Sequence, residues 1–145
     1  MVTITRDDRL LPKLRQVVQD DWAYILDSWK KSYRELGADQ HVPAHLYWPE
    51  MTARIERLRE NPAVEFRIAA DPDDHDFIWG WACVEGRMIV HYVFVRASAQ
   101  GQGVARMLCA DVPKPMVVTH WTKVAEAVHK KKPGSLLFEP SRRKK

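Results

Sequence analysis

Long apolar runs are missing from this sequence of 145 residues. A membrane-spanning helix needs roughly 20 consecutive apolar residues, and no stretch approaches that length. The first ten residues, MVTITRDDRL, carry acidic side chains where a secretory signal peptide would have its apolar segment. We therefore expect a cytoplasmic protein that makes no membrane contact.

Cysteine is scarce as well, with only Cys83 and Cys109 in the chain. Two cysteines form at most one disulfide, and neither lies in the CxxC or Cys/His spacing of a zinc site. His41 and His45 are four residues apart, but Pro43 between them disfavours the helix that would bring both onto one metal ion. We expect two buried thiols and no metal site.

Apolar residues nevertheless make up 46% of the chain, which has six tryptophans and neither an internal repeat nor a low-complexity segment. This composition predicts a single globular domain over residues 1–145, with a short N-terminal extension (1–12) and a basic C-terminal tail (141–145).

Positive charge is concentrated at the C-terminal end. Residues 106–145 hold ten Lys/Arg against three Asp/Glu, whereas residues 1–105 hold thirteen against sixteen. The runs HKKK (129–132) and SRRKK (141–145) suit an acidic partner such as nucleic acid. The alternative is a solvated helix end followed by a frayed tail, because lysines also favour the negative end of a helix dipole.

The first part of the chain predicts a strand followed by two helices. KLRQVV (13–18) has strand chemistry. Apolar residues then recur at steps of three and four, which predicts a helix over 21–36. After a loop, Pro49 suits the first turn of a second helix over 49–60.

The rest of the chain alternates strands with helices. Short links between three strands predict an antiparallel meander, and a strand–helix–strand crossover pairs its two strands in parallel. The fold class is therefore α/β (α+β), a mixed sheet with helices on both faces. The expected elements are strands at 63–70, 77–85, 88–95, 116–121 and 135–140, with helices at 104–112 and 122–131.

The stretch AQGQGVARML (99–108) places Gly101 and Gly103 between a strand and the first turn of a helix. Backbone amides at such a junction have no internal partners, and glycine lets the chain wrap closely around a phosphate. No Lys-Ser/Thr pair follows to make a Walker A loop, and the third glycine of a dinucleotide-binding motif is absent.

This stretch and the order of elements resemble the GCN5-related N-acetyltransferase (GNAT) superfamily. QGQGVA (100–105) matches the acyl-CoA signature Gln/Arg-x-x-Gly-x-Gly/Ala of that family, and the resemblance covers about residues 13–140. The segments DSWKKSYRE, DPDDHDFIWGWA and VHYVFV also resemble small acetyltransferase-like proteins of bacteriophages, in which case the location would be the host cytoplasm.

The resemblance implies acetyl-CoA or another acyl-CoA as cofactor. Amides of residues 101–106 would hold the pyrophosphate, and the backbone of Phe94 and Val95 would pair with the pantetheine arm like an added strand. Arg106 would meet the adenosine phosphates, or is an ordinary solvated helix residue. The implied cofactor-binding residues are Val93, Phe94, Val95, Gln100, Gly101, Gln102, Gly103, Val104, Ala105 and Arg106.

The implied reaction is transfer of an acyl group to an amine by direct attack, which needs a base. His91 is the first candidate, because related arylalkylamine acetyltransferases carry a histidine at this strand position and simple alternation puts it on the face of Val93 and Val95. The alternative is a histidine packed in the sheet. His120, at the end of the parallel strand, is the second candidate, with a capping role as its alternative.

The family's usual proton donor is a tyrosine in the pattern Asn-x-x-Ala-x-x-x-Tyr. Aligning Ala125 with the alanine puts Thr122 at the asparagine and His129 at the tyrosine, and both are departures. They favour a second hypothesis, a catalytically inactive GNAT-fold protein that binds nucleic acid or protein through its basic C-terminus. A third is an acyltransferase that modifies nucleic acid.

The acceptor pocket of the family is built from the first two helices and their loop. Tyr33, Tyr47 and Trp48 are the candidate substrate-binding residues, because an aromatic cup suits a flat or cationic amine. Tyr33 also belongs to the apolar stripe of the first helix, whereas Tyr47 and Trp48 are expected in the loop. The acceptor is left open as a small-molecule, protein or nucleic-acid amine, as is the oligomeric state.

Overall fold

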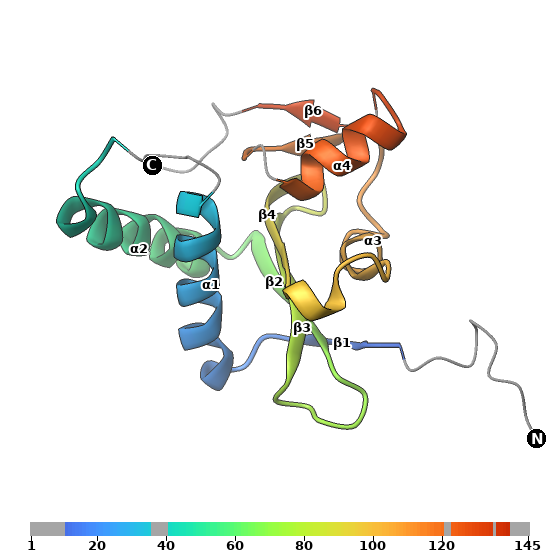
Figure 1. The fold of residues 1–145 in the computed structure, drawn as a ribbon, viewed down its shortest axis with the longest axis horizontal. Coiled ribbons are helices and arrows are strands. Elements are labelled where there is room, and N and C mark those ends of the chain that lie inside the picture. Colours follow the sequence, from blue (N-terminus) through green and yellow to red (C-terminus); the bar gives the residue numbers. More distant parts are fainter. Residues whose placement is uncertain (1–10, 36–40, 121–122, 135, 140–145) are drawn as a thin grey trace, which may run out of the picture.

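The computed structural model describes residues 11–35, 41–120, 123–134 and 136–139 (Figure 1). Two helices follow a short first strand, and three long strands follow the helices. The elements are β1 (Lys13–Gln16), α1 (Trp22–Glu35), α2 (Ala44–Glu60), β2 (Val64–Ala70), β3 (Ile78–Glu85), β4 (Ile89–Val95), α3 (Val104–Leu108), β5 (Met116–Val118), α4 (Lys123–Lys131) and β6 (Leu136–Phe138). Short 3₁₀ turns, η2 (Gln19–Asp21) and η3 (Ala97–Ala99), precede α1 and the glycine stretch.

The six strands form one sheet in the order β1-β2-β3-β4-β5-β6. Pairing is antiparallel from β1 to β4 and parallel from β4 to β6. This confirms the predicted meander, and the parallel crossover through α3 follows it as expected.

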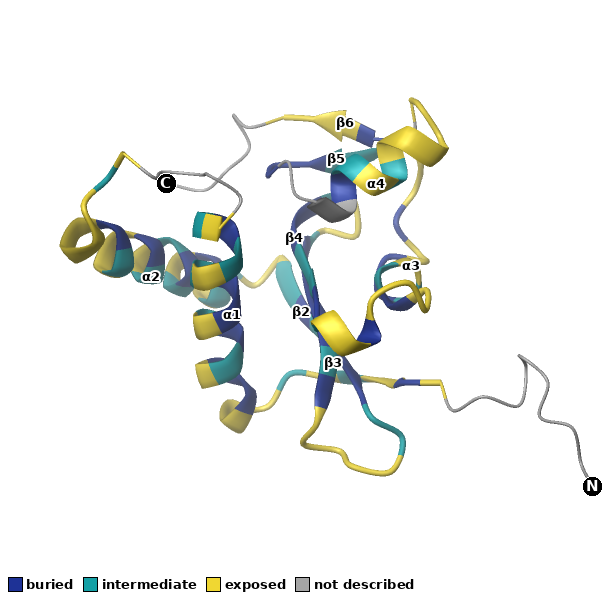
Figure 2. Ribbon diagram, viewed as in Figure 1, coloured by how far each residue is buried: buried dark blue, intermediate teal, exposed yellow. Residues whose placement is uncertain are grey.

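Helices cover both faces of the sheet, as predicted (Figure 1). The α1 and α2 helices pack on one face over an aromatic-rich cluster, and α3 and α4 pack on the other over smaller aliphatic side chains. Each of α1 and α2 turns its buried side towards the sheet and its exposed side outward (Figure 2). Among the described helices, none is long and apolar enough to cross a membrane.

The α2 helix begins at Ala44, five residues before the predicted start at Pro49. The carbonyl of Pro43 accepts hydrogen bonds from the Leu46 and Tyr47 amides and opens the first turn. Tyr47 then continues the buried stripe of Met51 towards the N-terminus. Burial of Tyr47 outweighs the cost of Pro49 inside the helix. The expectation that Tyr47 and Trp48 lie in a loop is therefore wrong.

Two later elements are shorter than predicted. The α3 helix ends at Leu108 instead of continuing through residue 112, and β5 ends at Val118 instead of continuing through residue 121. In both cases a side chain forms the hydrogen bond to a backbone carbonyl that a backbone amide would form if the element were longer. Arg67 donates to the Leu108 carbonyl at 2.8 Å, and Thr119 and His120 bond to β4 through their side chains.

A nearly buried ion pair fixes the entry to α1. The two terminal guanidinium nitrogens of Arg15, Nη1 and Nη2, donate to Asp21 at 2.7 and 2.9 Å, and the Val18 amide donates to the same carboxylate at 2.8 Å. Burial alone raises the pKa of Asp21, but the bonds from Arg15 and Val18 outweigh it and leave the pKa below its usual value.

Replacing Asp21 by asparagine is expected to lower the free energy of unfolding by about 2 kcal/mol at pH 7, because Arg15 loses its counter-charge. A lowered folded-state pKa stabilises the fold above the unfolded value, near 4, and this contribution disappears as the pH falls through the folded value. Urea unfolding at several pH values should therefore show the difference between Asp21→Asn and the wild type shrinking below about pH 4. A difference that stays constant down to pH 2.5 would contradict this account.

Candidate active site

The parallel strands β4 and β5 stay together for only two residues. Ile89 pairs with Val117 and Val90 with Val118, and the Thr119 amide continues the ladder to the Val90 carbonyl at 3.1 Å. The next carbonyl of β4, that of His91, accepts instead from side chains. His120 Nδ1 lies 2.8 Å from this oxygen, and the Thr119 hydroxyl donates to it at 3.3 Å. Beyond His91 no further pairing joins β4 to β5 among the described residues.

A β-bulge in β4 coincides with the end of this pairing. Cys83 of β3 pairs with Tyr92 and Val84 pairs with Val90, so His91 is an additional residue without an opposite partner on β3. Regular alternation fails here. Val90 packs with the α3/α4 cluster and Tyr92 with the α1/α2 cluster. Val90 and Tyr92 therefore lie on opposite faces of the sheet, and the expectation that His91 shares the face of Val93 and Val95 stays a prediction.

Past the bulge, β4 has an edge towards β5 that pairs with no strand in the part of the chain that the structure describes. The Arg96 amide bonds to Trp79 on β3, whereas the Val95 carbonyl accepts from the Gln100 side chain at 3.2 Å on the opposite side. By strand alternation, the backbone groups of Val93 and Val95 face the open edge, and those of Phe94 face β3. The backbone of Phe94 is thus turned away from the edge that it was expected to line, and its side chain packs towards α1.

The glycine stretch follows at the end of this edge. Gly101 and Gly103 have φ angles of +80° and +81°, which L-residues adopt only with strain. The amides of residues 101–106 donate no hydrogen bond to any residue that the structure describes. The side chains of Gln100 and Gln102 donate to the carbonyls of Val95 and Ser98 and form no hydrogen bond with these backbone amides. Arg106 lies exposed on α3.

Two features outside the stretch hold α3 against the sheet. Val104, its first residue, lies so close to Gly80 of β3 that a Cβ on Gly80 would stand 3.1 Å from Val104 Cγ1. At the other end Arg67 bonds to the Leu108 carbonyl and to both oxygens of Asp111, at 2.6 and 3.0 Å. Because α3 has only five residues, these contacts fix it more than its own helical bonds do.

Replacing Arg67 by methionine is expected to lower the free energy of unfolding by about 1.5 kcal/mol, because the buried Leu108 carbonyl loses its donor. Asp111→Asn is the matched control. It keeps the Arg67–Leu108 bond, and the Asp111 side chain is 51% exposed, so its cost should stay below about 0.5 kcal/mol. Urea unfolding measures both. Equal losses in the two variants would show that the ion pair, not the helix end, carries the effect.

The two candidate catalytic histidines lie in one hydrogen-bonded chain. His91 is 1% exposed; its Nε2 is 2.9 Å from Glu85 Oε1 and its Nδ1 is 3.1 Å from the Thr119 hydroxyl. His120 is 6% exposed, and its Nδ1 lies 2.9 Å from the same hydroxyl. The structure thus connects both candidates through Thr119, and both ring nitrogens of His91 have partners.

Of the three candidate substrate residues, only Tyr33 lies beside a candidate base. The Tyr33 ring packs edge-on against His120, with centroids 4.9 Å apart. Tyr47 is buried and donates its hydroxyl hydrogen to the Lys30 carbonyl at 2.7 Å. Trp48 is half-buried, with the Lys30 ammonium 5.8 Å from its ring centroid. Their substrate role stays a prediction.

A hollow of about 170 Å³ lies beside the glycine stretch. Its walls come from the β2–β3 turn and from η3 and the residues after it. The lining residues are Asp71, Phe77, Trp79, Ser98, Ala99 and Gln102. Asp71 accepts from the Trp79 indole at 3.1 Å, so this wall is held in place by a hydrogen bond.

Cys83 and Cys109 are both buried thiols without a disulfide. Burial raises the pKa of Cys83 well above its usual value and that of Cys109 to about 11. Neither is a thiolate at neutral pH, so neither suits a nucleophile. In the described ranges no three His, Cys, Asp or Glu side chains gather as metal ligands. Thr122 and the tail 141–145 lie outside the described residues.

Comparison with solved structures identifies the architecture. The chain superposes on the crystal structure of a predicted acetyltransferase with acetyl-CoA from Clostridium acetobutylicum, with a TM-score of 0.60 and 17% identity, over 83% of this chain and 88% of that one. The chain has the GNAT fold. An acetyltransferase from Vibrio fischeri matches with a TM-score of 0.50 and 16% identity, over 77% and 98% of the two chains. No protein-family model and no curated protein sequence matches.

Sequence reasoning missed three residues that shape this candidate site. Gly80 carried a readable signal, because an isolated glycine in a bulky strand often marks a close backbone approach. Glu85 ends the same strand, and the tight hairpin after it brings it back towards His91. Arg67 carried no such signal, since its partners Leu108 and Asp111 are more than 40 residues away.

Proposed function

We propose that this protein is an acyl-CoA-dependent N-acyltransferase, with acetyl-CoA as the donor. One observation supports the proposal most directly. An open strand edge, at Val93 and Val95, leads into a glycine turn whose amides, at residues 101–106, donate to no described residue. An extended amide-bearing chain fits the edge, and a diphosphate fits the turn.

The residues present match the chemical groups of the cofactor. The edge offers backbone donors and acceptors from Val93 and the Val95 amide, which suit the two amides of a pantetheine arm. Gln100 closes this edge by occupying the Val95 carbonyl. The five-residue α3 has a small dipole, so the amides themselves, opened by Gly101 and Gly103, supply most of the attraction for phosphate. Acetyl-CoA supplies the thioester.

The proposed reaction joins the acceptor nitrogen to the acyl carbon and breaks the carbon–sulfur bond. The nitrogen loses one proton and the thiolate sulfur gains one, so an amide and free CoA thiol result. His91 and His120 are the proposed bases, and Tyr33, Tyr47 and Trp48 the proposed acceptor contacts. The crystallised neighbour from Clostridium acetobutylicum, which holds acetyl-CoA, supports the choice of donor.

A second function draws on the end of α4. His129, Lys130 and Lys131 form its last turn, where a family tyrosine would be expected, and all three are exposed. A basic surface of this kind suits a GNAT-fold protein that binds nucleic acid without transferring an acyl group. Such binding would weaken steeply with salt, because it depends on phosphate contacts.

Acetyl-CoA at 100 times its dissociation constant is expected to raise the free energy of unfolding by roughly 2.7 kcal/mol, which a thermal shift measures. Gly103→Ala should cut this stabilisation by about 1.4 kcal/mol, a tenfold loss of affinity, because its left-handed turn is strained. Gly134→Ala is the matched control, since Gly134 has a φ of +86° and open space like Gly103, but lies after α4.

The outcomes separate the two functions. Stabilisation that falls in Gly103→Ala and persists in Gly134→Ala supports the transferase. No stabilisation of the wild type, together with salt-sensitive retention of nucleic acid, would replace it by the binding function. Equal losses in both glycine variants would show that the glycine turn is not the binding site.

A further inference from the structure

We propose that the hollow beside the glycine stretch binds the adenine base of the acyl-CoA, and that residues of the β2–β3 turn select an adenine nucleotide there. The inference rests on the proposed function for its ligand, but binding of the base can be measured without acetyl-CoA and without turnover. The hollow has a volume of about 170 Å³, and its lining residues are Asp71, Phe77, Trp79, Ser98, Ala99 and Gln102.

The hollow adjoins the turn proposed for the diphosphate. Gln102 lines it, and the backbone amide of Gln102 is among those of residues 101–106 that donate to no described residue. Ser98 and Ala99 of η3 also line it and come shortly before that turn. In an adenine nucleotide only a ribose separates the base from the phosphates. A diphosphate on these amides therefore leaves the base within reach of the hollow.

Phe77 and Trp79 supply the flat apolar surface on which a base stacks. Phe77 is 41% exposed, but its ring has a fixed neighbour. The Arg96 guanidinium lies 4.2 Å from the ring centroid, and Arg96 Nε donates to the Ile78 carbonyl at 2.8 Å. The Trp79 indole is oriented by its hydrogen bond to Asp71, at 3.1 Å. Both rings are therefore held in place by contacts within the protein.

Asp71 supplies the polar contact that distinguishes one base from another. Its Oδ1 accepts from the amides of Asp73 and Asp74, at 2.9 and 3.1 Å, and its Oδ2 accepts from the Trp79 indole. A carboxylate oxygen has two lone-pair sites, so among the described contacts Oδ2 has one site left. The bonds from the Asp73 amide and the Trp79 indole hold the pKa of Asp71 below its usual value. The carboxylate is therefore ionised at neutral pH and only accepts.

This remaining site suits adenine and disfavours other purines. Adenine carries an exocyclic amine, which donates, where guanine and hypoxanthine carry an oxygen, which accepts. The amine can donate to Asp71 Oδ2, whereas a carbonyl oxygen at the same place is repelled by the carboxylate. The Ser98 hydroxyl and the Gln102 side-chain oxygen, which bond to no described residue, can meet a ring nitrogen and the second amine hydrogen.

¹H–¹⁵N NMR of the full chain, labelled at the tryptophan indoles, tests the site with ADP and inosine diphosphate (IDP) as probes. We expect ADP to move the Trp79 indole signal, which Trp79→Phe identifies. ADP should bind about tenfold more tightly than IDP, because IDP has an oxygen in place of the amine. A Trp79 signal that ADP does not move would overturn the site, and equal affinities for ADP and IDP would overturn the role of Asp71.

Asp71→Asn tests the selection of the base. Asparagine keeps an oxygen for the amides of the turn but places an NH₂ group where Oδ2 stood, so the preference for ADP over IDP should disappear or reverse. Asp73→Asn is the matched control, because it removes the same charge from the same turn without lining the hollow. It should keep the roughly tenfold preference. An unchanged preference in Asp71→Asn would contradict the proposal.

Phe77→Ala tests the stacking surface and stays informative if Asp71→Asn fails to fold, since Phe77 is an exposed side chain. We expect this variant to bind ADP about tenfold more weakly. Unchanged affinity for ADP would show that the base does not stack in the hollow.

S-acetylphosphopantetheine, which has the thioester and the arm but no nucleotide, separates this inference from the proposed function. Acetyl-CoA should bind at least about tenfold more tightly than this fragment, and Phe77→Ala should remove most of that advantage. Equal thermal stabilisation by both compounds in the wild type would leave the transferase intact and overturn the adenine site. A wild type that acetyl-CoA does not stabilise, but whose Trp79 signal ADP moves, would remove the proposed function and support an adenine site in the hollow.

Discussion

Replacing Gly80 by valine is expected to lower the free energy of unfolding by about 3 kcal/mol and to abolish the stabilisation by acetyl-CoA. A Cβ at this position would lie 2.6 Å from the backbone carbonyl oxygen of Phe94, closer than real Cβ contacts come. Because the obstacle is backbone, β3 and β4 must move apart. The same movement shifts Val93 and Val95, the residues on the open edge.

The control variants of Gly80 separate the strand contact from the helix contact. Gly80→Val also approaches Val104 of α3, which is a side-chain contact and therefore easier to relieve. Adding Val104→Ala should recover less than half of the lost stability, because the Phe94 oxygen remains in the way. Gly86→Ala, in the exposed β3–β4 turn where a Cβ meets nothing within 4 Å, should leave acetyl-CoA binding intact. Full recovery by Val104→Ala would contradict the backbone argument.

The same distinction between local and distant contacts explains which elements the sequence predicts well. The stripe of apolar residues in α1 repeats at helical spacing, and the helix begins and ends within one residue of its predicted bounds. The α2 start was missed, because the local preference of Pro49 for a first turn competes with the burial of Tyr47, which depends on the sheet. The spacing of apolar residues predicts a single helix or strand, but it carries no information about the elements that pack against it.

Contacts made far along the chain set the elements that were predicted too long. The α3 helix ends where Arg67, 41 residues earlier in the sequence, donates to the Leu108 carbonyl. No pattern within residues 104–112 predicts this helix end. The candidate site follows the same rule. The glycine turn could be predicted from its own residues, whereas the bulge at His91 could not, because a bulge is a mismatch between two strands. The link from His91 through Thr119 to His120 depends on that mismatch.

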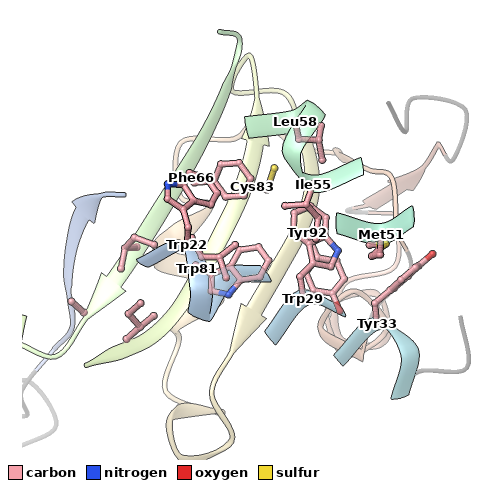
Figure 3. Packing of buried hydrophobic residues seen from close by; sticks show 14 of the residues in the cluster. Trp22, Trp29, Tyr33, Met51, Ile55, Leu58, Phe66, Trp81, Cys83 and Tyr92 are labelled. Atoms are coloured by element: carbon pink, nitrogen blue, oxygen red, sulfur yellow. The ribbon is translucent and has the colours of Figure 1, made fainter. Parts of the chain in front are cut away.

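Replacing Trp29 by alanine is expected to cost about 3–5 kcal/mol of unfolding free energy, the loss typical of emptying a large aromatic site in a core. Trp29 is 1% exposed and stacks on Tyr92 with ring centroids 5.0 Å apart. It also meets Trp81 at 5.3 Å, Phe66 at 6.3 Å and His120 at 6.2 Å. One side chain of α1 therefore joins the β2, β3 and β4 strands and the end of β5. Figure 3 shows Trp29 beside Tyr92.

Phenylalanine at the same position should cost far less than alanine, for a reason specific to this indole. Trp29 Nε1 is buried and has no hydrogen-bond partner among the described residues, and such an unpaired donor costs about 1–3 kcal/mol. Trp29→Phe removes this donor, which offsets part of the lost packing. Trp81→Phe is the matched comparison, because Trp81 Nε1 donates to the Ser28 hydroxyl at 2.9 Å.

Urea unfolding of the three variants should therefore rank them with Trp29→Phe the most stable, Trp81→Phe next and Trp29→Ala the least. The two phenylalanine variants remove the same atoms from the same buried cluster, so their difference isolates the fate of one N–H group. Trp81→Phe leaves Ser28 without a donor, while Trp29→Phe leaves no group behind. If Trp29→Phe were as costly as Trp81→Phe, the Trp29 indole would have to be hydrogen-bonded in solution, and its place against His120 would need to change with it.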